Sequence, residues 1–424
     1  MAGPTLLLIN KFYHDTGRAG GVGRYVVQEQ AELERRGWTV VPFAIREPES
    51  RPTPWARFFP PAHDYAAPGW SPRHLAAAVN LLWNRAAARN LSRLLREVRP
   101  DVVHLHNIYH HLSPSLLPVL RRHRLPAVMT LHDLRLLCPA IHMLRQGEVC
   151  ERCRGGRFLE AVRGKCVKGS RAASLLAAVE TAHQWRRRLY PRTVTRFLCP
   201  SAFYADKYAE WGYPREKLVH LPNFVDTDAW RPATEPPGDY YLYFGRLSAE
   251  KGLRDLLAAH ARWEAADADA LELRIAGSGP LAAELADRAR ALGLRRCRLL
   301  GPVPPATLAP LVARARFTVL PSRWYENGPL ALLESLAAGV PVAGADIGGI
   351  PEHLDDGADG VLFRPGDPAD LHRALQAAAA LPPAARAAAR RKAETRYAVT
   401  VHLDALERHL REVAGAAPGN AGSG

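Results

Sequence analysis

The sequence has 424 residues, of which 47% are hydrophobic and 23% charged, as in an ordinary globular protein. This length predicts two or three domains, because most single domains contain about 100 to 200 residues. No apolar run approaches the about 18 residues of a membrane-spanning helix, and the first residues lack a signal-peptide pattern, so we expect a cytoplasmic protein.

A glycine-rich segment follows the first predicted strand. Residues 5–10 are apolar, residues 17–23 hold four glycines, and a helical pattern then runs to Gly37 before a second strand at 38–45. In such a Rossmann-type unit, glycines let a phosphate or a sugar approach the backbone at a helix N-terminus. The glycines lack the Gly-x-Gly-x-x-Gly spacing, and Glu47 comes two residues after the second strand, which disfavours a nicotinamide cofactor.

A loop, a helix and two strands are predicted next. Residues 48–72 are rich in proline and aromatic residues and predict a surface loop, and a helix over 73–98 leads into a buried strand at 100–107. The next strand, 127–131, ends at His132, where open parallel sheets bind their ligands. His132 is therefore a candidate site residue, although single histidines more often pack or face solvent.

A cysteine-rich insertion at about 138–166 interrupts this alternation. Four of the six cysteines fall within these 29 residues: Cys138, Cys150, Cys153 and Cys166. In a cytoplasmic protein they predict thiolate ligands for a structural zinc ion that would hold together a loop without its own core. Only one Cys-x2-Cys pair is present, so free or disulfide-forming thiols are the alternative. No base accompanies them in the sequence, which argues against a catalytic role.

A basic segment, 183–196, follows a predicted helix over 172–183. Within it, residues 185–196 hold five arginines, two aromatic residues and no acid. This stripe, like the net charge of +15, could bring the protein to an anionic inner membrane face, whereas no nucleic-acid-binding motif surrounds it. A solvated helix end and an arginine-rich composition explain the charge equally well.

The second half begins after a proline-rich linker at 229–239, so we assign residues 1–235 and 236–395 to two domains. A strand at 240–244 runs into Gly-Arg-Leu-Ser-Ala-Glu-Lys-Gly, residues 245–252. Two cations at a strand-to-helix turn predict a clamp for a diphosphate. The next two strands end near Gly277 and Val303, the first of them in a glycine turn.

Two glutamates bracket the start of a later helix. After an apolar strand at 317–320, Glu326 lies in a loop, Pro329 suits the first helical position, and Glu334 lies within a helix that Gly339 ends. An anionic ligand could dock at the unpaired N–H groups of this helix start. Two solvated surface acids are the alternative.

These motifs resemble those of the family 4 retaining glycosyltransferases, also called glycosyl transferases group 1. The similarity is carried by Glu-x7-Glu at 326–334, by Gly-Arg-Leu-x3-Lys-Gly at 245–252 and by Thr-Leu-His-Asp at 130–133, and it extends over about residues 5–413. It implies the α/β GT-B fold, with two Rossmann-like domains facing across a deep cleft. A helix over 396–414 would cross back to the first domain, before a disordered tail at 415–424.

The resemblance also implies roles for the candidate residues. Arg246 and Lys251 would neutralise the leaving diphosphate, Glu334 would bind the ribose hydroxyls and Glu326 the sugar hydroxyls, while His132 would orient a donor hydroxyl. Further donor contacts would come from Gly20, Gly21, Gly23, Gly277, Val303, Asn327, Gly328, Pro329 and Leu330.

The implied reaction moves a sugar from a UDP- or GDP-linked donor to a hydroxyl acceptor in glycan, glycolipid or natural-product biosynthesis. No cofactor is expected for catalysis. The Asp-x-Asp pairs at 226–228 and 267–269 have the form found in metal-dependent enzymes, but one precedes the linker and the other lies in an alanine-rich helix. The rival functions are another GT-B enzyme, such as a nucleotide-sugar epimerase, and a basic protein that binds nucleic acid or membranes.

Overall fold

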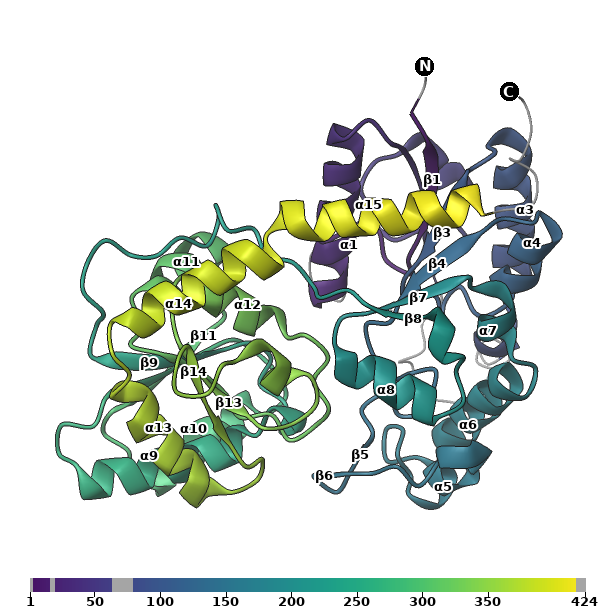
Figure 1. Ribbon diagram of the computed structural model, residues 1–424. Coiled ribbons are helices and arrows are strands. Elements are labelled where there is room, and N and C mark those ends of the chain that lie inside the picture. Colours follow the sequence, from purple (N-terminus) through teal and green to yellow (C-terminus); the bar gives the residue numbers. More distant parts are fainter. Residues whose placement is uncertain (1–2, 16–19, 63–78, 417–424) are drawn as a thin grey trace.

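The computed structural model describes residues 3–15, 20–62 and 79–416, which form two domains side by side (Figure 1). Each domain contains a six-stranded sheet in which every pair of neighbouring strands is parallel. Parallel strands need crossover connections, which cover both faces of a sheet with helices and bury the strands on both sides. The two sheets lie within the predicted ranges 1–235 and 236–395.

The first sheet has the spatial order β2-β1-β3-β4-β7-β8. Its strands are β1 (Thr5–Ile9), β2 (Thr39–Phe43), β3 (Val102–Leu105), β4 (Ala127–Thr130), β7 (Arg196–Cys199) and β8 (Leu218–His220). The helices of this domain are α1 (Gly20–Arg35), α3 (Arg85–Glu97), α4 (Leu116–Arg122), α5 (Leu159–Arg163), α6 (Arg171–Arg186), α7 (Leu189–Thr193) and α8 (Ala202–Glu210). Short 3-10 turns are η2 (Pro54–Phe58), η3 (Arg154–Gly156) and η4 (Arg215–Lys217).

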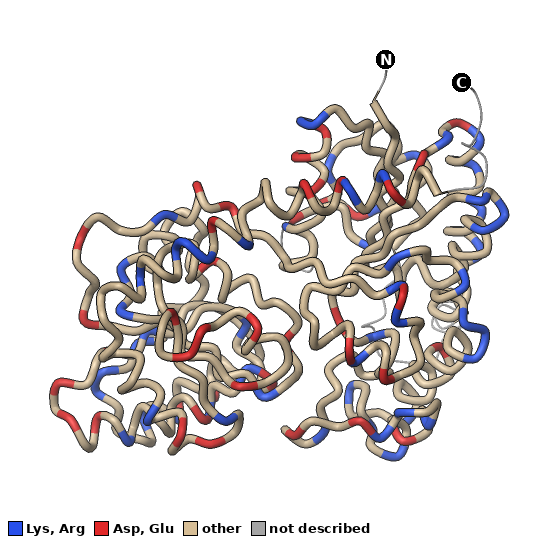
Figure 2. The backbone as a smooth tube through the Cα atoms, viewed as in Figure 1, with Lys and Arg blue, Asp and Glu red and all other residues tan. Residues whose placement is uncertain are grey.

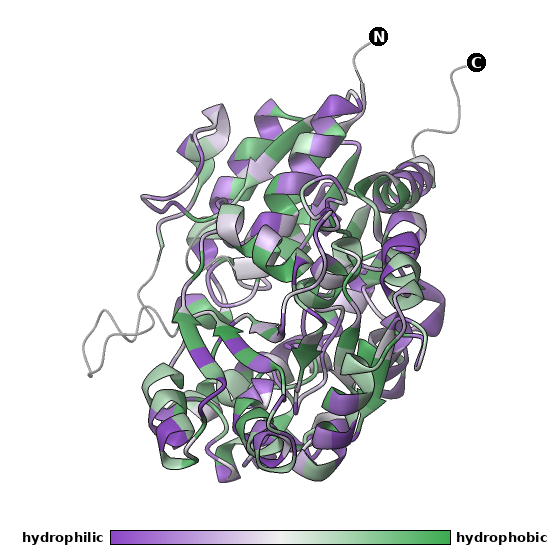
Figure 3. Cartoon of the chain, turned by 90° about the vertical axis from the view of Figure 1, so that its left-hand side faces the viewer, coloured by the Kyte–Doolittle hydropathy of each residue, from purple (hydrophilic) through white to green (hydrophobic). Residues whose placement is uncertain are grey.

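The second sheet has the order β11-β10-β9-β12-β13-β14. Its strands are β9 (Tyr240–Phe244), β10 (Glu272–Ala276), β11 (Cys297–Gly301), β12 (Thr318–Leu320), β13 (Val342–Ala345) and β14 (Gly360–Phe363). Its helices are α9 (Leu253–Ala266), α10 (Ala282–Ala291), α11 (Pro305–Ala313), α12 (Leu330–Ala337), α13 (Pro368–Ala379) and α14 (Ala384–Lys392), with short turns η5 (Ala249–Lys251) and η6 (Ile350–His353). Buried hydrophobic residues form a core in each domain. Figure 3 shows hydrophobic and hydrophilic residues interleaved along the helices.

The last helix, α15 (Val399–Gly415), crosses from the second domain onto the first, as expected (Figure 1). A π-helical turn, η7 (Ala393–Tyr397), joins it to α14. The buried apolar side chains of α15 recur every three or four residues and pack on one face of the first sheet, against Leu6 and Leu8 of β1. They are Leu403, Leu406, Leu410 and Val413.

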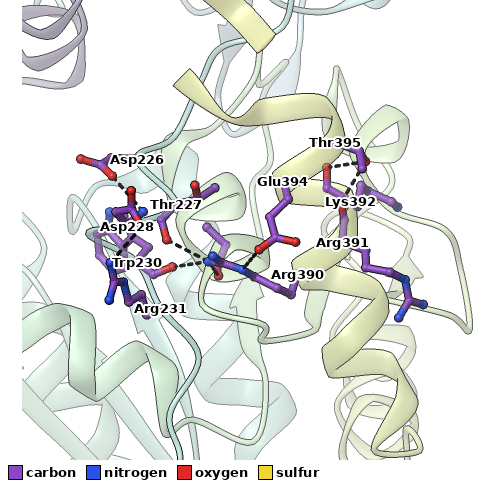
Figure 4. A network of polar contacts seen from close by, with 11 residues as sticks. Asp226, Thr227, Asp228, Trp230, Arg231, Arg390, Arg391, Lys392, Glu394 and Thr395 are labelled. Atoms are coloured by element: carbon purple, nitrogen blue, oxygen red, sulfur yellow. Dashed lines mark hydrogen bonds and ion pairs between the residues drawn. The ribbon is translucent and has the colours of Figure 1, made fainter. Parts of the chain in front are cut away.

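Arg390 of α14 forms hydrogen bonds with the linker between the domains (Figure 4). Its guanidinium donates to the carbonyl oxygens of Thr227 at 2.9 Å, Trp230 at 2.8 Å and Ala337 at 2.6 Å. Ala337 is the last residue of α12, so one side chain satisfies backbone carbonyls of both the linker and a helix end.

Two predictions within the first domain need correction. The helix expected over 73–98 is interrupted, because Asn84 caps α3 by accepting a hydrogen bond from the Ala87 N–H at 2.9 Å. The loop expected over 48–72 contains η2 in its described part. Residues 63–78 and 417–424, and with them part of these predictions and most of the expected disordered tail, lie outside the described residues.

Within the described ranges, no helix combines the length and the apolarity needed to cross a membrane. Lysines and arginines are distributed over both domains (Figure 2). The predicted basic stripe is divided among the end of α6, α7 and the start of β7. Arg196, at its end, donates a hydrogen bond to Glu412 of α15 at 2.6 Å, so part of the stripe serves the docking of that helix.

The docking of α15 yields a stability prediction. Leu406 is fully buried, so Leu406→Ala should lower the free energy of unfolding by about 2–5 kcal/mol through lost apolar contact and the cavity left behind. Val401 lies on the same helix but is 40% exposed, and Val401→Ala should change this free energy by less than about 0.5 kcal/mol. Urea unfolding measures both, and equal changes would show that α15 does not dock through its buried face.

Candidate functional site

The candidate residues gather where the carboxyl ends of the two sheets approach each other. His132 follows β4, Arg246 follows β9 and Glu326 follows β12. A cavity of about 160 Å³ lies between the domains and is lined by Gly21, Val22, Tyr25, His132, Tyr204, Asn223, Trp324, Glu326, Asn327, Gly328, Pro329 and Leu330. This is where open parallel sheets bind their ligands.

Glu326 forms an ion pair with Lys251 at the wall of this cavity. The Lys251 Nζ atom lies 2.6 Å from the Glu326 Oε1 atom, which also accepts a hydrogen bond from the Ser322 hydroxyl at 2.6 Å. Glu326 is 5% exposed, and burial alone would raise its pKa. The charge of Lys251 and the two hydrogen bonds outweigh burial, so the pKa lies below the usual value and the group is a carboxylate at neutral pH.

Glu334 lies within α12 and is 7% exposed. It lines a second cavity, of about 240 Å³, together with Arg24, whose Nη1 atom lies 3.3 Å from the Glu334 Oε1 atom. Burial raises the pKa of Glu334, and the neighbouring charge of Arg24 opposes that rise. Arg24 belongs to α1, so this pair joins the two domains.

Arg246 is exposed, and no hydrogen bond or ion pair holds its guanidinium within the described parts of the chain. It is therefore available to an anion. Gly277 supports this turn through its backbone: its φ is 143°, and a Cβ atom there would lie 1.8 Å from the carbonyl oxygen of Gly245. Val303 packs near Tyr240 and Phe244 and does not line the two interdomain cavities, and its contact with a donor stays a prediction.

The residues after Glu326 bind the first domain directly. The Asn327 side-chain amide donates to the carbonyl oxygen of Leu131 at 2.7 Å and accepts a hydrogen bond from Ser201 at 3.1 Å. The Asn223 amide donates to the carbonyl oxygen of Gly328 at 2.8 Å. Three side chains thus hold the loop before α12 against the ends of the first sheet.

His132 ends a buried polar chain. Its Nε2 atom lies 2.8 Å from Nδ1 of His106, and the Nε2 atom of His106 lies 3.5 Å from the carboxylate of Glu29. The same carboxylate lies 2.6 Å from Nδ1 of His104. Burial, with smaller contributions from His104, His402 and Lys11, lowers the pKa of His132 to about 3, so its imidazole is neutral.

The glycines of the first domain need a correction. Gly20, Gly21 and Gly23 form the first turn of α1 and do not lie in a loop before it. A Cβ atom on Gly21 would lie 3.2 Å from the Cδ1 atom of Leu330, so this glycine allows α1 to approach the start of α12. Pro329 is the residue that precedes α12, one position before the predicted one.

The alternative of two solvated acids is wrong for Glu326 and Glu334, because both are buried at the cavity walls. The Asp-x-Asp pairs form local turns. Asp226 accepts from the N–H groups of Asp228 and Ala229 at 2.9 and 3.0 Å, and Asp267 accepts from the Asp269 N–H at 2.9 Å. Each pair therefore has a local structural role in a turn.

Sequence reasoning missed the residues whose partners are distant in the chain. Arg24 and Asn223 carry no local sign of their contacts with the second domain. Glu29, in contrast, has a local sign of its role in the sequence. It is an acid on the buried face of α1, four residues after Tyr25 and four before Leu33. A buried acid on an otherwise apolar helix face indicates a polar partner in the core.

A larger cavity, of about 800 Å³, lies at the opposite end of the second sheet. It is lined by residues at the amino ends of β9, β10 and β11, including Arg274, Arg296 and Arg298. Glu272 forms ion pairs at 2.6 Å with both Arg274 and Arg298. The predicted site residues do not line this cavity, so its size does not make it the candidate site.

Two family models match consecutive parts of the chain. Glycosyltransferase Family 4 matches residues 19–229, and Glycosyl transferases group 1 matches residues 226–396. The chain belongs to the family 4 glycosyltransferases. The two family models meet at residues 226–229, which include Thr227, a residue whose carbonyl oxygen Arg390 binds.

Sequence relatives agree with this membership, and a solved structure agrees with the fold. This family 4 protein is 31% identical to a glycogen synthase of Mycobacterium tuberculosis. The match covers 70% of this chain but only 64% of the synthase, so the chain spans less than two thirds of that relative. A D-inositol 3-phosphate glycosyltransferase of Thermobifida fusca is 27% identical over 85% of this chain and 81% of that protein. The sucrose-phosphate synthase of Thermosynechococcus elongatus has a TM-score of 0.67 at 17% identity, covering 98% and 100% of the two chains, which confirms the GT-B fold.

A buried histidine beside the site makes the stability of this family 4 protein depend on pH. His402 of α15 is 3% exposed; its Nδ1 atom lies 2.7 Å from the carbonyl oxygen of Pro222, and its Nε2 atom lies 2.8 Å from the Tyr25 hydroxyl. Burial lowers the pKa of His402 to about 3, against about 6.5 in an unfolded chain. Between these values the unfolded state binds a proton that the folded state excludes, so stability falls as the pH falls.

We therefore expect His402→Gln to flatten the decline in stability below pH 6.5 by up to about 1.4 kcal/mol per pH unit. Urea unfolding at pH 7 and pH 5 measures the slope. His123 is exposed, so His123→Gln is the control and should leave the wild-type slope unchanged. An unchanged slope in His402→Gln would contradict the assignment.

Proposed function

We propose that this protein is a retaining glycosyltransferase that moves a sugar from a UDP- or GDP-linked donor to a hydroxyl group of a glycan, a glycolipid or a natural product, without a catalytic metal ion. The observation that carries the proposal is the arrangement of charges at the cleft. The buried Glu326 carboxylate pairs with the partly exposed Lys251 at its wall, and Arg246 is available beside the same sheet edge. A second buried acid, Glu334, lies on the following helix.

Departure of a nucleoside diphosphate builds negative charge, which preorganised cations stabilise. Arg246 offers a planar fork and Lys251 a point charge, and a bound diphosphate would give Lys251 a second anionic partner beside Glu326. Glu334, as an acceptor, suits the ribose hydroxyls, and Glu326 suits the hydroxyls of the sugar. N–H groups at the start of α12 add further donors.

In the proposed retaining reaction, the acceptor oxygen forms its bond to the anomeric carbon on the face from which the phosphate oxygen departs. The bond from that carbon to the phosphate oxygen breaks, and the departing oxygen takes the acceptor proton. No protein base is required by this scheme. The pairing of Glu326 with a lysine, and its low pKa, support a binding role over the role of a proton carrier.

His132 would bind a donor hydroxyl through its Nδ1 atom. A carboxylate at Glu29 can only accept hydrogen bonds, so it favours protons on the nearest nitrogens of His104 and His106. The Nδ1 atom of a neutral His106 then accepts from the Nε2–H of His132. This leaves Nδ1 of His132 without a proton, as an acceptor for a hydroxyl.

Similar proteins support a nucleotide-sugar donor. Solved structures of the Anabaena protein HepE contain UDP or UDP-glucose; the UDP-glucose complex has a TM-score of 0.64 to this chain at 16% identity and covers 96% and 99% of the two chains. The named relatives include a glycogen synthase and a D-inositol 3-phosphate glycosyltransferase, whose names indicate different acceptors, so the acceptor class rests on experiment.

A ligand panel tests the proposal. We expect thermal stabilisation by UDP or GDP, smaller stabilisation by ADP, and none by DNA or anionic liposomes, followed by slow hydrolysis of one UDP- or GDP-sugar without an acceptor. Arg246→Ala should remove most of the nucleotide effect. Stabilisation by DNA or liposomes alone would favour the nucleic-acid or membrane function, and conversion of the donor into its epimer would favour an epimerase.

The two glutamates should behave differently when substituted. Glu326→Gln should lower kcat about 100-fold or more while changing the Kd of the nucleotide less than about twofold, because it removes the charge beside the reacting sugar. Glu334→Ala should weaken nucleotide binding about tenfold through lost hydrogen bonds to the ribose. Calorimetry and steady-state kinetics separate these effects.

Glu284→Gln is the control for both substitutions, because this acid is exposed on the same domain and pairs with Arg254 at the surface. It should leave kcat and Kd unchanged. Equal and small effects of Glu326→Gln and Glu334→Ala would mean that the donor site lies elsewhere.

A further inference from the structure

The four cysteines of the insertion surround one small cavity. Cys138, Cys150, Cys153 and Cys166 all line a space of about 20 Å³, and all four are free thiols. They come from four separate points: before a short hairpin of β5 (Leu144–Arg145) and β6 (Glu148–Val149), directly after that hairpin, before η3, and after α5. The fold thus brings Cys138 and Cys166, which lie outside the Cys-x2-Cys pair, to the same cavity as that pair.

The insertion has little regular structure to hold these thiols in place. Its two strands have two residues each, and η3 and α5 have three and five. Small segments of this kind are commonly held together by disulfides or by a metal ion.

We infer that Cys138, Cys150, Cys153 and Cys166 bind one zinc ion. The ion fixes the shape of the insertion where it contacts the loop before Glu326 in the second domain, and we call this contact the clamp. Four thiolates are a set that zinc binds in tetrahedral geometry, and a cavity of about 20 Å³ has room for a single ion. Each thiol gives up its proton to solvent as its sulfur binds the ion, so binding releases protons without oxidation or reduction.

The thiols must draw closer when the ion binds. Among the described residues, the one set of three potential ligands with atoms within 4.8 Å of one another is Glu29, His104 and His106. That set is a poorer metal site, because both nitrogens of His104 are already engaged, with Glu29 at 2.6 Å and with Thr130 at 2.8 Å. The four cysteines, by contrast, line the cavity of about 20 Å³.

The insertion contacts the loop that leads to Glu326. The Glu151 carboxylate accepts a hydrogen bond from the Tyr325 hydroxyl at 2.9 Å, and Glu151 lies inside the Cys-x2-Cys turn, where a metal would fix its position. His142 packs against Trp324, with ring centroids 4.8 Å apart. Trp324 in turn lies beside Lys251, whose Nζ atom is 5.2 Å from the ring centroid.

A third contact comes from the hairpin, where a Cβ atom on Gly147 would lie 3.4 Å from the Nη1 atom of Arg323. Three consecutive residues before Glu326 therefore each meet the insertion. Loss of the metal should loosen these contacts and, with them, the Glu326–Lys251 pair. This consequence for the donor rests on the proposed function, whereas the metal site does not.

Metal analysis of the full-length protein tests the site. We expect about one zinc per chain, released stoichiometrically when the thiols react with a mercurial, and less than about 0.2 zinc per chain in Cys150→Ser and Cys153→Ser. Cys297→Ser is the matched control, because this cysteine lies on β11 of the second domain, and it should keep its zinc. Iron in place of zinc, a disulfide among the four cysteines, or no metal would overturn the inference.

If the serine variants fail to fold, the wild-type protein still decides, because its zinc content, its mercurial release and the tetrahedral thiolate spectrum of its cobalt-substituted form need no variant. Absence of all three would overturn the site.

Tyr325→Phe tests the clamp, because it removes only the hydroxyl that binds Glu151. We expect it to lower kcat/KM about threefold to tenfold in the zinc-loaded protein. After zinc removal it should have little further effect, because the substitution and the loss of zinc disrupt the same contact between Tyr325 and Glu151. Fully additive effects would overturn the clamp.

The two proposals can fail separately. A protein that binds zinc but no nucleotide would contradict only the proposed function, and a protein that binds nucleotide but no zinc would contradict only the metal site.

Discussion

The hydrogen bond from Asn327 to the carbonyl oxygen of Leu131 ties the two halves of the candidate site together. Its partners are the chain neighbours of Glu326 and His132, so a single buried contact sets the spacing between the two sheet ends. The Glu352 carboxylate strengthens the same interface by accepting hydrogen bonds from the first two N–H groups of α8, at 2.7 and 2.6 Å. Buried polar contacts of this kind favour one arrangement, because an unpaired partner would be costly.

The buried charges depend on that arrangement. Glu326 is a carboxylate because Lys251 and Ser322 compensate for its burial, and Glu334 has Arg24 of the other domain as its partner. A site in which charges are already oriented and desolvated can stabilise a developing charge with little reorganisation. Their cationic partners, which are themselves partly exposed, compensate for the burial of these two acids.

The cysteine-rich insertion extends this principle to the outer side of the donor loop. It reaches Arg323, Trp324 and Tyr325 from the first domain, so the segment before Glu326 is contacted by the insertion and the segment after it by Ser201, Leu131 and Asn223. Glu326 is thereby held from both sides by the domain that does not carry it.

The sequence by itself predicted most strands of the two large sheets, several of the longer helices and the positions of the acids and cations, because apolar runs and strand-to-helix turns depend on neighbouring residues. Only the tertiary structure decided which groups meet. Arg24 and Glu334 are 310 residues apart, and Asn327 and Leu131 are 196 apart, so no local pattern records their contacts. Even the start of α1 at Gly20 depends on packing, since its glycines are poor helix formers that allow close approach to α12.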